Sequence, residues 1–171
     1  MKEQQKKYEL TGEFIEHWSG KKLYRIRALV SFGVVVAGQL GGFVESEKNL
    51  DQSLSGDAWV YGDAWVYGDA EVSGNAEVSG DARVSGDARV RSYAVISERK
   101  MIFWASNVGS ENGTLTVFNG KDGLIVTRGC FTGTVDEFLA KSAEVHNDKT
   151  KNEYKLLIEV AKSRILGVKD E

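Results

Sequence analysis

The stretch GDAWVYGDAWVYGDAEVSGNAEVSGDARVSGDARV, residues Gly56–Val90, repeats every six residues. Each repeat holds a glycine, then Asp or Asn, then Ala, with an aliphatic residue two positions after the Ala. Neither an α-helix nor an ordinary strand has a period of six. The pattern predicts short strands joined by Gly-Asx corners, because glycine tolerates unusual backbone angles. The aliphatic positions are Leu54, Val60, Val66, Val72, Val78, Val84, Val90 and Ile96.

Three such strands would complete one triangular turn of 18 residues, with the aliphatic residues and alanines pointing inward. The pattern therefore predicts a β-helix in which residues 18 positions apart lie side by side on neighbouring turns. The outward pairs are Trp59 with Glu77, Trp65 with Arg83, and Glu71 with Arg89. We expect a cation–π contact between Trp65 and Arg83, and an ion pair between Glu71 and Arg89.

Two Trp and two Tyr side chains of the repeat are predicted to point outward. Aromatic residues in that position need a cover, which is either another subunit or a ligand. Arginines on the same repeat and on a later strand would suit an anionic, stackable molecule such as a nucleotide. The candidate ligand-binding residues are Trp59, Tyr61, Trp65, Tyr67, Arg83, Arg89, Arg91 and Arg128.

Smaller units are expected on either side of the repeat. The pattern of residues 1–33 predicts a polar tail as far as Lys7, followed by a β-hairpin that turns at Ser19-Gly20. Residues 34–98 predict the β-helix, with a polar loop over 45–55 ahead of the regular repeats. Residues 99–171 predict a small α+β domain. It is expected to hold three strands (100–106, 114–119 and 124–131), two helices with capping boxes at Thr134-Glu137 and Thr150-Glu153, and a solvated tail at 169–171.

The repeat resembles the hexapeptide-repeat family, whose members form a left-handed parallel β-helix, and the match covers residues 54–96. The resemblance implies a left-handed coil and a homotrimer with Trp59, Tyr61, Trp65 and Tyr67 near the seams between subunits. The segments LYRIRAL and LGGFVESEKNL, together with the GDAWVYG run, also resemble uncharacterised proteins of bacterial and phage genomes. The resemblance to that wider group implies only the fold and a bacterial or phage genomic context. It implies no particular activity, because the same fold serves many functions.

Composition narrows the classes of partner and compartment. A net charge of −3 and a pI near 5.5 argue against binding to a nucleic-acid polymer or a membrane surface. Cys130 is the single cysteine, which excludes an intrachain disulfide and a multi-cysteine metal cluster. The first ten residues lack the apolar core of a secretory signal. We therefore expect a cytoplasmic protein with no metal and no cofactor.

Catalytic residue types are scarce, and the repeat itself contains no histidine. Acyltransferases of the hexapeptide family commonly use a histidine as general base, so this counts against that activity. A Cys130–His146 pair beside Arg128 is an alternative, but a buried structural cysteine is the favoured interpretation. The repeat aspartates are interpreted as residues that stabilise their own turns rather than as calcium ligands.

The sequence thus predicts a non-enzymatic, homotrimeric β-helix protein that binds or sequesters a small anionic ligand, for example a nucleotide. In a phage genome, such a protein would suit a counter-defence role. Two alternatives stay open. One is a trimeric scaffold that presents the C-terminal domains to a protein partner. The other is a hexapeptide-type acyltransferase that depends on His17 or His146.

Overall fold

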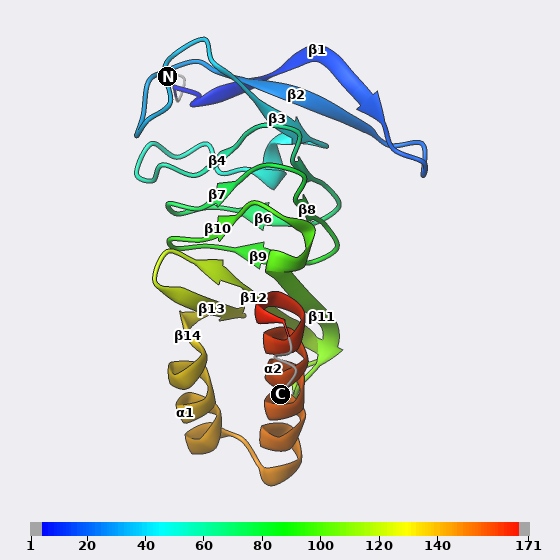
Figure 1. Cartoon of the computed structure of the whole chain (residues 1–171), viewed down its shortest axis with the longest axis vertical. Coiled ribbons are helices and arrows are strands. Elements are labelled where there is room, and N and C mark those ends of the chain that lie inside the picture. The colour runs from blue at the N-terminus through cyan, green and yellow to red at the C-terminus, as the bar shows by residue number, and fades with distance from the viewer. Residues whose placement is uncertain (1–4, 168–171) are drawn as a thin grey trace.

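The computed structural model describes residues 5–167, so residues 1–4 of the polar tail expected at 1–7 and the whole tail expected at 169–171 lie outside the described range. Figure 1 shows three parts in succession along the long axis. An N-terminal hairpin lies at one end, a stack of short strands follows, and a sheet with two helices forms the other end. Within residues 5–167, no helix is both long and apolar enough to span a membrane.

β1 (Tyr8–Glu16) and β2 (Lys22–Ala28) form the predicted antiparallel hairpin. β3 (Leu40–Val44) pairs antiparallel with β2 on one side and parallel with a strand of the repeat on the other. A Cβ atom on Gly41 would lie 2.5 Å from the carbonyl oxygen of Val60. Because glycine has no Cβ, β3 can lie directly on the repeat and join the hairpin to it.

Seven two-residue strands make up the repeat, and we call residues 56–96 the hexad stack. Strands 18 residues apart pair in parallel, which confirms the pairings predicted for Trp59, Trp65 and Glu71. The strands are β4 (Trp59–Val60), β5 (Trp65–Val66), β6 (Glu71–Val72), β7 (Glu77–Val78), β8 (Arg83–Val84), β9 (Arg89–Val90) and β10 (Val95–Ile96).

The predicted fold class, a left-handed parallel β-helix, is wrong. The sheets have the strand orders β1-β2-β3-β5-β8, β10-β7-β4, β11-β12-β13-β14 and β6-β9. The five-stranded sheet is mixed and the four-stranded sheet is antiparallel. None of the sheets formed by the described residues is closed or forms a solenoid sheet. Since a turn follows every two-residue strand, the ladders stay short, and the flanking segments add longer antiparallel pairings.

The corners of the hexad stack are held by the backbone. Gly62 has a φ of +64°, and the amide of Ala64 donates to the carbonyl of Tyr61 at 3.4 Å. This geometry is that of a type II′ turn, whose first central position favours glycine. Among residues 5–167, the carboxylates of Asp63 and Asp87 make no hydrogen bond, so the interpretation of the aspartates as turn-stabilising residues is wrong for them.

The interior of the hexad stack holds the predicted valines and alanines, each at most 1% exposed. Leu54 is an exception, because it is 49% exposed and lies in a turn. Leu50 is fully buried instead and bridges Val72. Residues 51–55 insert extra chain before the regular repeats, and a 3-10 helix, η1 (Glu47–Asn49), precedes them. The first aliphatic position is therefore displaced from its predicted place.

Four strands, rather than three, follow η2 (Arg99–Met101): β11 (Ile102–Val108), β12 (Gly113–Gly120), β13 (Gly123–Arg128) and β14 (Phe131–Thr134). The third predicted strand is broken because Gly129, with a φ of +57°, begins a turn. α1 (Val135–Val145) begins at the predicted capping box of Thr134 and Glu137. α2 (Asp148–Leu166) is capped by Asn147, so the second predicted capping box is wrong.

The four-stranded sheet joins the helices to the hexad stack, and the middle of its strand β12 is buried on both faces. Leu115 and Val117 of β12 pack in one apolar cluster with the helices, while Phe118 belongs to the cluster of the stack. The amide of Arg89 donates to the hydroxyl of Thr116 at 3.1 Å, and the hydroxyl of Thr127 donates to the carbonyl of Arg89 at 2.7 Å. The C-terminal sheet thus covers the last turn of the stack.

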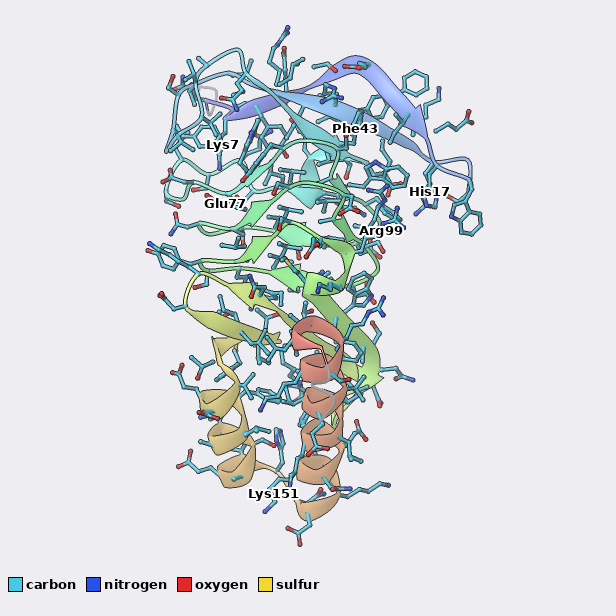
Figure 2. All side chains as sticks on the ribbon, viewed as in Figure 1. Lys7, His17, Phe43, Glu77, Arg99 and Lys151 are labelled. Carbon is cyan, nitrogen blue, oxygen red and sulfur yellow. The ribbon has the colours of Figure 1, made fainter. Side chains whose placement is uncertain are left out.

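The N-terminal end of the stack is covered by Lys7 and Tyr8, so Lys7 does not belong to a polar tail. Its ammonium group is buried, donates to the carbonyl of Ala58 at 2.6 Å and lies 4.3 Å from the ring centre of Phe32. Figure 2 shows Lys7 beneath the hairpin end of the molecule. Burial lowers the pKa of Lys7, and the nearby carboxylate of Asp51 opposes that effect.

Candidate anion-binding site

The outward aromatic residues of the hexad stack are largely covered by the chain's own N-terminal hairpin. Trp59 is only 2% exposed, because the rings of Tyr8 and Phe32 lie against it at centroid distances of 6.3 and 5.4 Å. Trp59 is thus shielded from solvent by residues of the same chain. This removes one reason for placing a subunit seam or a ligand over Trp59.

His17, in the turn between β1 and β2, covers a second aromatic pair. Its ring centre lies 5.8 Å from that of Trp65 and 4.9 Å from that of Tyr67. The guanidinium of Arg83 lies 3.6 Å from the ring centre of Trp65, which confirms the predicted cation–π contact. Burial, followed by the charge of Arg99, lowers the pKa of Arg83 from its usual value. Figure 2 shows His17 between the hairpin and the stack.

Three of the predicted arginines line one pocket of about 290 Å³, which we call the arginine pocket. Arg89 lies in β9, Arg91 follows it by two residues, and Arg128 ends β13. Glu111, in the turn between β11 and β12, lines the same pocket. The C-terminal sheet positions Arg128 here because β12 and β13 both contact the last turn of the hexad stack.

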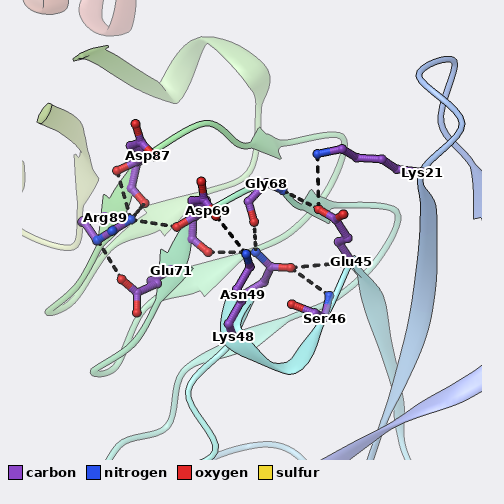
Figure 3. A network of polar contacts seen from close by, with 12 residues as sticks. Lys21, Glu45, Ser46, Lys48, Asn49, Gly68, Asp69, Glu71, Asp87 and Arg89 are labelled. Carbon is purple, nitrogen blue, oxygen red and sulfur yellow. Dashed lines mark hydrogen bonds and ion pairs between the residues drawn. The ribbon is translucent and has the colours of Figure 1, made fainter. Parts of the chain in front are cut away.

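Arg89 is held by the stack. Its Nε pairs with Glu71 at 2.7 Å, as predicted, and its Nη1 donates to the carbonyls of Asp69 and Asp87 at 2.8 and 3.1 Å. Figure 3 shows this arginine at one end of a polar network that continues through Asp69 to Lys48. Arg89 therefore contributes fixed positive charge to the pocket, with most of its donors already used.

Arg128 is less well satisfied. Its Nη1 lies 3.5 Å from a carboxylate oxygen of Glu111, and its guanidinium lies 6.0 Å from the ring centre of Tyr154. Its Nε and Nη2 are buried and have no hydrogen-bond partner among the described residues. Buried guanidinium nitrogens normally have partners, so Arg128 keeps two unsatisfied donors while its side chain lines the pocket.

Arg91 joins the wall of the pocket to β14. Its Nη1 donates to the carbonyl of Phe131 at 3.4 Å and to the hydroxyl of Thr132 at 3.2 Å. No carboxylate in residues 5–167 pairs with it. The pocket thus combines one arginine that is fixed by the stack with two that keep free donors.

The structure separates the other predicted ligand-binding residues from this pocket. Trp59 and Tyr61 line a cleft on a different side of the stack, and Trp65, Tyr67 and Arg83 form the cluster beneath His17. The predicted set is therefore divided among three places. Glu111 lies in a loop far from the repeat in sequence, so the repeat pattern does not predict its place in the pocket; the dipeptide Asn112-Gly113 is typical of a turn and indicates only where that loop lies.

The structure gives no support to the Cys130–His146 pair. Cys130 is exposed in the turn between β13 and β14, rather than on a strand face, so the buried structural interpretation is also wrong. The Nδ1 atom of His146 is 2.9 Å from the hydroxyl of Ser142, and that of His17 is 2.7 Å from the hydroxyl of Ser19. Within residues 5–167, no group of three or more His, Cys, Asp or Glu side chains is arranged to hold a metal ion.

Compared with known protein families and with curated proteins, the chain matches none at a significant level. The resemblance to the hexapeptide-repeat family therefore stays a prediction.

Proposed function

We propose that this protein binds a small ligand through a phosphate or carboxylate group held in the arginine pocket, and that it does so without catalysing a reaction. The observation that carries this proposal is that Arg89, Arg91 and Arg128 line one pocket, in which Arg91 has no carboxylate partner among residues 5–167. Planar guanidinium groups bind such anions with two parallel hydrogen bonds, and partial burial strengthens them.

The size and charge of the pocket support a small ligand. A volume of about 290 Å³ is near the lower limit of ligand pockets and is suited to one anionic group with little else. Asp87 and Glu111 also line it, and Glu111 lies beside Arg128, so the excess positive charge comes mainly from Arg91. A nucleic-acid polymer would need a long track of basic side chains along its backbone, with more free arginines than this pocket provides.

Isothermal titration calorimetry with inorganic phosphate, pyrophosphate and AMP tests this proposal. We expect R128Q and R91Q to weaken binding of the tightest of these probes roughly tenfold or more, because hydrogen bonds to charged groups are strong. We expect E111Q to tighten binding, since it frees the Nη1 atom of Arg128. R83Q is the matched control, because it removes an arginine of the same stack that lies against Trp65.

Equal affinity in wild type, R128Q and R91Q would contradict the proposal, as would weakening by R83Q alone. Thermal unfolding of each variant separates a loss of binding from a loss of structure.

A further inference from the structure

A separate cleft lies on another side of the hexad stack, over the three-stranded sheet β10-β7-β4. It has a volume of about 620 Å³, and we call it the lateral cleft. Its floor follows the 18-residue period. One column holds Asp57, Asn75 and Tyr93, and the next holds Trp59, Glu77 and Val95. Three strands at the usual spacing give this floor a length of roughly 10 Å.

Both ends of the chain's fold close this cleft. At one end the loop after β2 contributes Val34 and Gln39, and at the other the turn after β12 contributes Lys121. The amide of Lys121 donates to the carbonyl of Tyr93 at 2.9 Å, which fixes that turn against the stack. The hairpin region and the C-terminal sheet thus limit how far a molecule can extend along the floor.

The walls combine aromatic rings with open hydrogen-bonding groups. Tyr61 and Tyr93 are 37% and 56% exposed, so their rings are accessible, unlike that of Trp59. The carboxylate of Glu77 and both tyrosine hydroxyls make no hydrogen bond to the described residues. The Oδ1 atom of Asn75 accepts from the backbone amide of Asp57, and the NH₂ group of Asn75 has no partner among those residues. Figure 2 shows Glu77 at the side of the stack.

We propose that the lateral cleft binds a planar, uncharged heteroaromatic molecule of the nucleobase or nucleoside class. Accessible tyrosine rings provide stacking surfaces for such a molecule. The carboxylate of Glu77 and the amide of Asn75 can accept from and donate to the edge of a base. The carboxylates of Asp57 and Glu77 oppose the single ammonium of Lys121, which disfavours a phosphate group at this place.

This site is independent of the arginine pocket, because the two share no lining residue. Failure of one proposal therefore leaves the other standing. Variants of Tyr61 and Tyr93 should change nucleoside binding alone, and variants of Arg91 and Arg128 should change phosphate binding alone.

Saturation-transfer-difference NMR and calorimetry with adenosine, guanosine, cytidine and uridine test the lateral cleft on the full chain. We expect at least one nucleoside to bind, with Y93A and Y61A each weakening it roughly fivefold or more, the range for loss of one stacking ring. Tyr67 occupies the same repeat position as Tyr61 but contacts His17, so Y67A is the matched control. It should bind the nucleoside as wild type does.

Absence of binding by all four nucleosides at concentrations up to about 5 mM would overturn the inference. So would binding that Y93A, Y61A and E77Q all leave unchanged. Tyr93 is more than half exposed, so Y93A should fold, and its thermal unfolding checks this directly.

Discussion

At the residue scale, Ser92 departs from the repeat. It occupies the position that Gly74 holds one turn earlier, with nearly the same φ, +62° against +68°. A non-glycine residue in this region costs about 1–2 kcal/mol, and glycine would lose more entropy on folding. We therefore expect S92G to stabilise the protein by about 0.5–1 kcal/mol in urea unfolding.

The reverse change one turn earlier is the control for this prediction. A Cβ atom on Gly74 would lie 2.8 Å from the backbone nitrogen of Ser92, so G74S adds a backbone clash to an unfavourable φ. We expect it to destabilise the protein by about 2 kcal/mol or more. A lower unfolding midpoint for S92G than for wild type would contradict the argument from backbone strain.

At the scale of elements, Asn49 fastens η1 to the hexad stack. Its Oδ1 accepts from the amides of Glu45 and Ser46 at 3.1 and 3.0 Å, and its Nδ2 donates to the carbonyls of Gly68 and Ala70 at 3.1 and 2.9 Å. Figure 3 shows these contacts around the buried amide. N49A would leave several buried backbone groups unpaired, so we expect a loss of about 3 kcal/mol in unfolding free energy.

Two further variants make this prediction specific. N49D keeps the acceptor but loses both donors, so it should also be strongly destabilised. N75A removes one hydrogen bond at an exposed corner and should change stability by no more than about 0.5 kcal/mol. If N49A and N75A unfold at the same urea concentration, Asn49 does not fasten this element.

The elements that the sequence predicts well are those set by local pattern. The 18-residue pairing follows from the repeat itself, and α1 begins where Thr134 and Glu137 predict it. The errors arise where distant segments decide the outcome. Leu54 fits the repeat pattern, but the extra residues of the preceding loop let Leu50 take the buried place. A local pattern carries no information on such insertions.

The candidate site was predictable in part, for the same reason. The repeat spacing places Arg89 beside Glu71, and that pair is confirmed. The approach of Arg128 to Arg91 depends on how the C-terminal sheet packs on the last turn of the stack, which no short-range pattern determines. For the same reason the sequence does not predict that the N-terminal hairpin covers Trp59 and Trp65. The homotrimer stays a prediction, and these two tryptophans no longer provide an argument for it.

At the scale of the whole molecule, Tyr8 joins the N-terminal hairpin to the hexad stack. Its buried hydroxyl donates to the carbonyl of Leu50 at 2.5 Å and lies 3.0 Å from that of Glu47. Burial, reinforced by the charges of Glu47 and Asp51, raises the pKa of Tyr8 above its usual 10.0. The folded chain thus keeps this proton at a pH where the unfolded chain has released it.

The sign of the pH dependence follows from that difference. Above about pH 10 the unfolded state binds fewer protons than the folded state, so stability falls as pH rises, by at most about 1.4 kcal/mol per pH unit. Lys7 acts in the opposite direction. Its pKa is lowered by burial, so stability rises with pH from its folded pKa up to the unfolded value of 10.5, and its contribution ends there.

We expect Y8F to be less stable than wild type at pH 8, by about 1–2 kcal/mol, because the buried carbonyl of Leu50 loses the hydroxyl that donates to it. The gap should narrow steadily above pH 10, since Phe cannot ionise in the unfolded chain. The contribution of Lys7 is common to both proteins and cancels in their difference. Urea unfolding of both proteins between pH 8 and about pH 11 measures the gap, with Y93F as an exposed control that should show none. A gap between Y8F and wild type that is constant across this range would mean that Tyr8 titrates alike in the folded and unfolded chains.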